Sequence, residues 1–239
     1  MHLNPVTHRP IVRAGGWALI LGAIAFMGVF AILAARFNYP GVLDGSADAV
    51  LPALLATGES GRAVWALYAL LPLIWLPAGV GSYYAFRATS PAAMLLALQF
   101  AVTASISMML GLMRWPSIHW RLAEAYAVAD PGQRTVLAAV FDGLNSYLGN
   151  YVGEFLGELS FSMFFLLSAW AMLKSRAIPR WAAAIGLVTG VAGLVGMFRN
   201  ITGAVAPVAS INNYLLPIWM IGFGILLLKQ RDDEQSIAP

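Results

Sequence analysis

The sequence predicts an all-α membrane protein folded as a six-transmembrane-helix bundle, and three observations lead to this fold class. Of the 239 residues, 60% are hydrophobic and only 10% are charged, whereas soluble chains carry roughly 25% charged residues. Mean hydropathy is positive, at +0.75. Apolar runs of about 20 residues, the length that crosses a bilayer, recur along the whole chain. We therefore treat residues 1–239 as a single integral membrane domain.

Six spans are expected, and each is an apolar run with polar or charged ends. Reading the hydropathy pattern places them at 15–35, 63–86, 91–113, 147–173, 181–198 and 208–228. The first run is too long for a typical secretory signal, and no A-x-A cleavage pattern follows it, so we interpret it as a helix of the bundle.

Short interfacial helices are expected in the outer loops. The apolar character of the fourth span already begins at Thr135, so we divide this stretch near Asp142 and Gly143 and place the first piece on the membrane surface. Residues 120–129 form a second candidate, and a break is expected at 130–132. A long extramembrane loop is the alternative for both pieces. Residues 50–56 are interpreted as a surface segment, the alternative being a lid over an outward pocket.

The positions of Lys and Arg predict the orientation, because cytoplasmic loops are enriched in these residues. One side of the expected bundle carries its basic residues in short segments: Arg9, Arg13, Arg87, Lys174, Arg176, Arg180, Lys229 and Arg231. The other side spreads fewer of them over longer loops: Arg36, Arg62, Arg114, Arg121, Arg134 and Arg199. Both termini are therefore expected in the cytoplasm.

The fourth span carries two stripes that single it out. Gly149, Gly153 and Gly157 recur every fourth residue and predict close approach of another helix backbone. Asn150, Glu154 and Glu158 form a second stripe, about 100° around the helix. Carboxylates at membrane depth are costly and indicate a functional site by default.

Partners for these acids are expected at the same depth, in the outer half of the bundle. The fifth span reaches that surface with Arg199 and Asn200, and the sixth leaves it with Asn212 and Asn213. We expect Arg199 to pair with Glu154, and Glu158 to bond to the amides of the sixth span or to stay protonated. Ser105, Ser107 and Arg114 of the third span are possible additions. The alternative is that all these groups only hold helices together.

The sequence lacks the motifs of several common classes of enzyme. There is no phosphate-binding loop, no G-x-S-x-G elbow and no H-E-x-x-H pair, so no recognised catalytic motif is present. Cysteine is absent, and His2, His8 and His119 all fall outside the expected spans. Met108, Met109 and Met113 near His119 could hold Cu(I), but ordinary packing is the preferred interpretation. We expect no metal and no cofactor, and the small net charge of +3 gives no indication of nucleic acid as a partner.

The loop from Lys174 to Trp181, with Pro179 and Arg180 before a glycine-rich helix, resembles a bacterial family of small integral membrane proteins known as domain of unknown function 4386. The resemblance extends from the first span to the sixth. It implies a membrane fold in the bacterial cytoplasmic membrane and supplies no site residues. The acids of the fourth span depart from the more apolar pattern of that family.

The leading functional hypothesis is non-enzymatic: the protein binds or passes a small amphipathic or lipid-like molecule at the polar site in the outer half of the bundle. One alternative is an accessory subunit of a larger membrane complex, in which the polar stripe contacts a partner or another copy. The other is an intramembrane enzyme that uses Glu154 and Glu158 as acid and base. Apart from membrane lipids, no partner is specified by the sequence.

Overall fold

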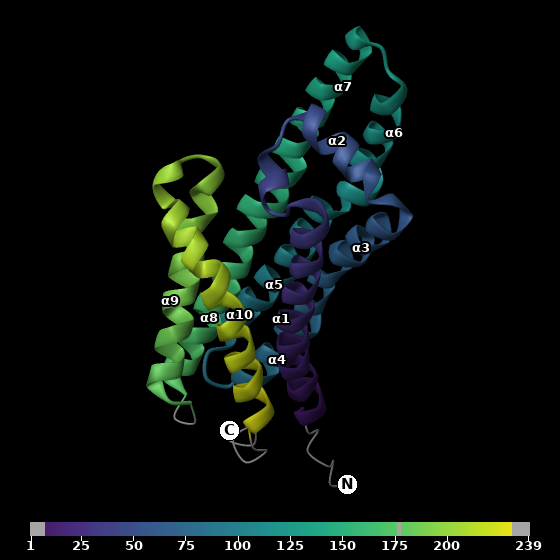
Figure 1. Cartoon of the computed structure of the whole chain (residues 1–239). Coiled ribbons are helices and arrows are strands. Elements are labelled where there is room, and N and C mark those ends of the chain that lie inside the picture. Colours follow the sequence, from purple (N-terminus) through teal and green to yellow (C-terminus); the bar gives the residue numbers. More distant parts are fainter. Residues whose placement is uncertain (1–7, 176–177, 231–239) are drawn as a thin grey trace. The chain divides into compact units, whose positions relative to one another are not determined.

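The computed structural model describes residues 8–175 and 178–230, and all of its regular structure is helical (Figure 1). His2, Arg176 and Arg231 of the sequence analysis lie outside the described residues. Six helical stretches are long and apolar enough to cross a membrane: Arg9–Phe37, Gly58–Phe86, Pro91–Val128, Pro131–Lys174, Arg180–Asn200 and Gly203–Lys229. Each contains one of the expected spans. The prediction of an all-helical protein with six helices long and apolar enough to span a membrane is confirmed.

The helical segments are of three types, α, π and 3-10. The α-helices are α1 (Arg9–Phe37), α2 (Ala47–Ala56), α3 (Gly58–Leu70), α4 (Trp75–Phe86), α5 (Pro91–Met113), α6 (Trp120–Val128), α7 (Pro131–Leu144), α8 (Gly157–Lys174), α9 (Arg180–Gly196) and α10 (Ala206–Lys229). Two π-helical segments are η3 (Trp115–His119) and η4 (Asn145–Leu156). Short 3-10 turns are η1 (Gly41–Asp44), η2 (Leu71–Ile74), η5 (Met197–Asn200) and η6 (Gly203–Val205).

The helix does not break at Asp142 and Gly143, so the division expected there is wrong. α7 continues to Leu144 and passes directly into η4, where the hydrogen-bonding pattern widens to i→i+5. Neither residue ends a helix in this setting, because the backbone hydrogen bonds continue through both. The break expected at 130–132 is found, since α6 ends at Val128 and Asp130 caps α7 with a capping box to Gln133.

The chain divides into two compact units, which we describe separately. Unit 1 comprises Met1–Ile24, Ile74–Ser105 and Glu158–Pro239, and unit 2 comprises Ala25–Leu73 and Ile106–Gly157.

In unit 1, α9 lies between α8 and α10, and its glycines make that packing possible. A Cβ added at Gly190 would lie 2.5 Å from Leu166 of α8, and one added at Gly186 would lie 2.5 Å from Trp219 of α10. Gly196 meets the backbone of Ala209 in the same way, at 3.2 Å. Without a hydrophobic driving force between helices in lipid, such close contact supplies much of the stabilisation.

Aromatic side chains fill the interior of unit 1. The ring of Phe161 lies 4.4 Å from that of Trp75 and 4.6 Å from that of Phe165. Phe223 of α10 is fully buried and lies within 6.3 Å of Phe165. These contacts join α4, α8 and α10 into one core.

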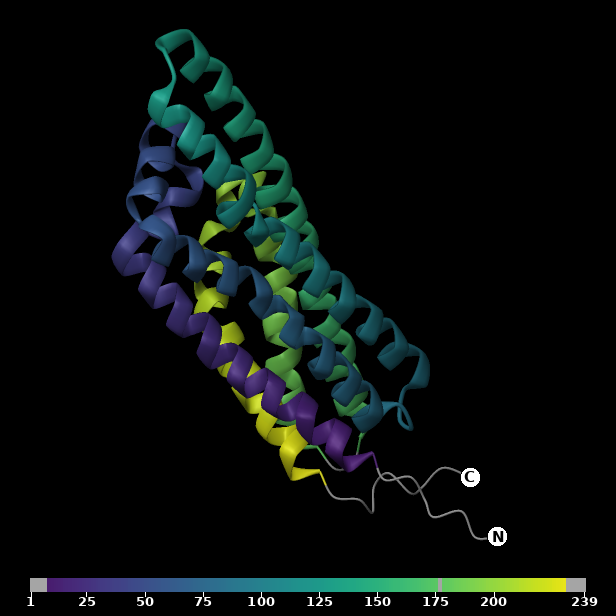
Figure 2. The same ribbon diagram turned by 90° about the vertical axis from the view of Figure 1, so that its right-hand side faces the viewer.

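In unit 2, α6 and α7 form an antiparallel hairpin against which α2 packs (Figure 2). α2 buries Val50, Leu51 and Leu54 in that contact. The adjoining core is aromatic, with Trp65 of α3 stacked on Trp115 of η3 at 4.8 Å. Residues 50–56, interpreted from the sequence as a surface segment, are therefore part of a helix with one face in the core.

The glycine stripe of η4 packs directly on α5. A Cβ at Gly111 would lie 2.5 Å from the Cα of Gly153, and one at Gly157 would lie 2.8 Å from Met108 Cγ. Gly149 meets the guanidinium of Arg114 at a similar distance, 2.5 Å from its Nη2. The close helix approach expected from Gly149, Gly153 and Gly157 is confirmed within unit 2.

We expect Gly111→Ala to lower the free energy of unfolding by about 1–3 kcal/mol, since the methyl group would push α5 away from the backbone of η4. Thermal unfolding of the purified protein in detergent measures this effect. Gly143→Ala is the matched control, because a Cβ at that exposed helical position meets nothing within 4 Å and helix propensity favours alanine. Equal unfolding temperatures for the two variants would contradict the proposed role of the contact.

Candidate functional site

The polar stripe expected to form one site is divided between the two units. Glu158, Arg199, Asn200, Asn212 and Asn213 belong to unit 1, whereas Asn150 and Glu154 of η4 belong to unit 2. Each group is therefore described with its own unit.

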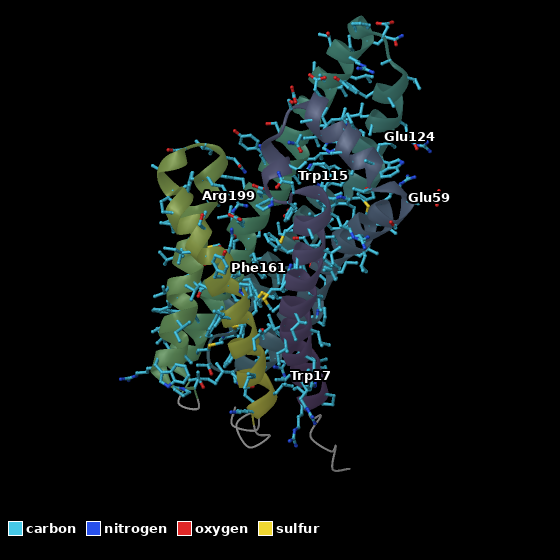
Figure 3. The ribbon with its side chains drawn as sticks, viewed as in Figure 1. Trp17, Glu59, Trp115, Glu124, Phe161 and Arg199 are labelled. Carbon is cyan, nitrogen blue, oxygen red and sulfur yellow. The ribbon has the colours of Figure 1, made fainter. Side chains whose placement is uncertain are left out.

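In unit 1, Glu158 and Arg199 form an ion pair. Glu158 lies in the first turn of α8. Arg199, labelled in Figure 3, lies in η5, the 3-10 turn that follows α9. The distance from Arg199 Nη1 to Glu158 Oε1 is 2.6 Å, and the two side chains are 28% and 22% exposed. Such a short charge-assisted contact between half-buried groups is stronger than a surface ion pair.

The partner of Arg199 in the structure is thus Glu158, one helical turn beyond the residue that the sequence analysis chose. The turn η5 places Arg199 beside the start of α8, and Glu158 is the carboxylate found there. The expected pairing of Arg199 with Glu154 joins residues of different units and stays a prediction.

One turn deeper in α8, a second polar group surrounds Gly193. A Cβ at Gly193 would overlap the Oγ of Ser162 and would lie 3.3 Å from the Nδ2 of Asn212. The Oδ1 of Asn212 is buried and has no hydrogen-bond partner among the described residues. This oxygen is a hydrogen-bond acceptor inside a helix apolar enough to span the membrane.

The neighbouring amides differ in exposure. Asn213 points to the exposed face of α10, and Asn200 is half-buried at the end of η5. Asn212 lies beside Gly193 of α9, close to Ser162 of α8.

An apolar groove of about 390 Å³ follows the outer side of α9 in the same unit. It is lined by Leu187, Val188, Val191, Ala192, Val195 and Val208. Val195 lies one turn before Arg199. The groove therefore ends close in sequence to the ion pair.

In unit 2, the buried Arg114 is the centre of a second charged cluster. Its side chain is only 4% exposed, its Nε donates to Asn145 Oδ1 at 3.0 Å, and its Nη1 donates to the carbonyl of Gly111. The guanidinium lies 4.9 Å over the Trp115 ring, and its charge interacts with that of Glu154. Neutralisation and dense hydrogen bonding are what a charge at this depth requires.

Sequence reasoning gave Arg114 only an accessory place and missed Asn145. The spacing of Asn145 and Gly149, which share one side of the helix, is the signal that could have identified both residues. Gly149 leaves space for the long side chain of Arg114 from α5, and the amide oxygen of Asn145 accepts a hydrogen bond from it.

His119 and Met108 each pack against neighbouring residues in this structure. His119 is buried between Trp115 and Phe141, at ring distances of 4.9 and 4.7 Å, and Met108 packs on Gly157. Among the described residues, no three His, Cys, Asp or Glu side chains come together as a metal site would require.

A double-mutant cycle on Glu158 and Arg199 tests the ion pair. We expect Arg199→Gln and Glu158→Gln each to destabilise the protein, because each single change leaves a half-buried charge without its partner. The double variant should be more stable, by about 1–3 kcal/mol, than the summed destabilisations of the two single variants predict. Denaturant unfolding in detergent gives the coupling. Arg121 and Glu124, an exposed pair at 3.0 Å, serve as the matched control and should couple too weakly to detect. Equal coupling for the two pairs would argue against a special role for Glu158 and Arg199.

One of three comparisons with known proteins finds a match. A family model described as domain of unknown function (DUF4386) matches residues 14–229. Neither the curated proteins nor the solved structures contain a match. The matched range covers parts of both units and both charged clusters. The resemblance expected from the basic loop before α9 is confirmed, and the chain belongs to the DUF4386 family of proteins of unknown function.

Proposed function

We propose that this protein binds, or passes across the membrane, a small amphipathic or lipid-like molecule at a polar site in the outer half of its helical bundle. The observation that carries the proposal is the half-buried pair of Arg199 and Glu158, with the unpaired acceptor of Asn212 one turn deeper. Charges and unpaired acceptors at membrane depth are costly and are retained where function uses them.

The chemistry of these groups suits a polar head group. An anionic group would compete with Glu158 for the guanidinium of Arg199, an ammonium would compete with Arg199 for the carboxylate, and a zwitterion would engage both. A hydroxyl or N–H of the same molecule could donate to Asn212 Oδ1, which lacks a donor among the described residues.

The groove on α9 supplies the apolar half of such a site. Its lining is entirely aliphatic, so it favours an acyl or isoprenoid chain over any polar group. A chain lying along Leu187 to Val195 would bring its head group toward Arg199, one turn further along the sequence.

The remaining residues of the site keep their proposed roles. Asn200 and Asn213 would contact the head group at the membrane surface. Asn150 and Glu154 lie on η4 of unit 2, where Glu154 interacts with Arg114, and their place in a polar site stays a prediction.

We also propose that the protein lies in the bacterial cytoplasmic membrane with both termini in the cytoplasm. The proposal is supported by an aromatic and basic belt at one end of unit 1. Trp17, Trp170 and Trp181 are each about half exposed or more, at 49%, 49% and 66%, and Lys174 lies 5.0 Å over the ring of Trp170. Interfacial tryptophan with cytoplasmic Lys and Arg is the expected pattern for that side of a membrane.

Mass spectrometry of lipids retained on the purified protein tests the binding site. We expect Arg199→Gln to reduce a retained anion about tenfold, Glu158→Gln to reduce a retained cation by the same factor, and each variant to reduce a retained zwitterion, since each change removes one charge-assisted contact. Arg180→Gln is the control, since Arg180 is an exposed arginine at the opposite end of α9. An unchanged ligand profile in both site variants would remove the binding assignment. Loss of a co-purifying protein subunit in its place would favour the accessory-subunit alternative.

The absence of native cysteine makes the orientation directly testable. In intact bacterial cells, we expect a membrane-impermeant maleimide to label Ser46→Cys, in the loop before α2, and to label Ala88→Cys, between α4 and α5, only after lysis. Both positions are exposed, so accessibility depends on the side of the membrane. Labelling of Ala88→Cys in intact cells would reverse the proposed orientation.

A further inference from the structure

Unit 2 contains a pocket that the proposed function does not use. It has a volume of about 610 Å³ and lies between α2, α6 and the first turn of α7. Its lining residues are Asp48, Pro52, Leu55, Ala56, Ala123, Tyr126, Ala127 and Arg134. The volume falls in the range of small-molecule sites, roughly 300–1,000 Å³.

The pocket follows from how α2 and α6 divide their faces. α2 uses Leu51 and Leu54 for the core of unit 2, and Pro52 and Leu55, about 100° further around the helix, line the pocket. α6 contributes Ala123 and Ala127, whose small side chains leave space open. The resulting wall is apolar over most of its lining.

The polar end of the pocket is organised around Tyr126. Its hydroxyl donates to the carboxylate of Asp48, and the guanidinium of Arg134 lies 5.1 Å over its ring. The capping box of Asp130 and Gln133 fixes the first turn of α7, which carries Arg134. The cap thus fixes the backbone of Arg134, and its guanidinium contacts the Tyr126 ring.

This end holds one carboxylate and one guanidinium, and the guanidinium is the group that an anion would contact. The carboxylate of Asp48 already accepts the tyrosine hydroxyl. Arg134 makes a cation–π contact but no ion pair with any residue that the structure describes. A guanidinium presents five N–H donors in a fork that matches carboxylate and phosphate oxygens.

We propose that this pocket binds an anionic single-chain amphiphile, with its carboxylate or phosphate on Arg134 and its chain against the wall formed by Pro52, Leu55, Ala123 and Ala127. The shared chemistry is an anionic head on one alkyl chain, which a fatty acid and a single-chain phosphate ester both have. The site lies in a different unit from Glu158, Arg199 and Asn212 and uses none of them, so it stands or fails independently of the proposed function.

Photolabelling of the full chain tests the proposal. The protein is reconstituted in phosphatidylcholine nanodiscs and irradiated with a diazirine-bearing palmitate, and the adducts are located by mass spectrometry of its peptides. We expect adducts on α2 and α6 that octanoate and octyl phosphate remove by competition, and that octylamine and octanol leave in place. Stronger competition by octanoate would identify a carboxylate ligand, and stronger competition by octyl phosphate a phosphate ligand.

Two variants and one control separate specific binding from partitioning into lipid. Arg134→Gln should reduce adducts on α2 and α6 about tenfold, since it removes the charge-assisted contact. Ala127→Phe should reduce them as well, because it fills the pocket from an exposed position and leaves the core of unit 2 untouched. Arg121→Gln, which removes an exposed arginine of α6 outside the lining, should leave labelling unchanged.

The proposal would be overturned by adducts confined to other helices. It would also be overturned by equal labelling of Arg134→Gln, Ala127→Phe and Arg121→Gln, or by octylamine competing as well as octanoate. Labelling of α9 and α10 in the same experiment reports on the apolar groove of unit 1 and serves as an internal reference. Unchanged labelling there, with loss on α2 and α6, shows that a variant is still folded.

Discussion

Where Gly111 of α5 meets Gly153 of η4, the two backbones lie so close that a methyl group on either residue would overlap the other helix. In lipid, apolar side chains gain little by leaving their surroundings for one another, so this kind of contact has to hold helices together. Its consequences extend along α5. Met108 covers Gly157, and Arg114 reaches across Gly149 to the amide of Asn145. The position of the buried guanidinium is therefore a result of the glycine stripe as much as of its own hydrogen bonds.

Charge is neutralised locally in both units. In unit 1, Arg199 pairs with Glu158, and in unit 2, Arg114 is held by Asn145 and the carbonyl of Gly111 while interacting with Glu154. An unpaired charge at such a position would cost several kcal/mol. Each cation is therefore neutralised or hydrogen-bonded by residues of its own unit. In the proposed function, a ligand at Arg199 would exchange one ionic contact for another, and its affinity would therefore depend on head-group chemistry.

A cation beside an apolar wall occurs twice, in different settings. Arg199 follows an aliphatic groove on a helix long enough to span the membrane, and its charge is already balanced by Glu158. Arg134 stands at the end of a pocket formed by α2 and the α6–α7 hairpin, and it has a tyrosine ring as its neighbour. The first arrangement is suited to exchange between ligands and the second to retention of an anion. Both fit an amphipathic molecule, because each combines one ionic contact with a long apolar surface.

The sequence by itself determined the fold class, the number of long apolar helices and the stripe of glycines. These features depend on local composition and on helical periodicity, and a single amino-acid sequence shows both. The choice of partners was decided only by the tertiary structure. Arg199 could have faced either acid of the stripe, since Glu154 and Glu158 lie one turn apart on one side of the helix, and only the turn at η5 selects Glu158. The continuous helix through Asp142, the burial of Arg114 with Asn145 and the pocket beside Tyr126 likewise depend on packing between segments far apart in the chain, which no local pattern encodes.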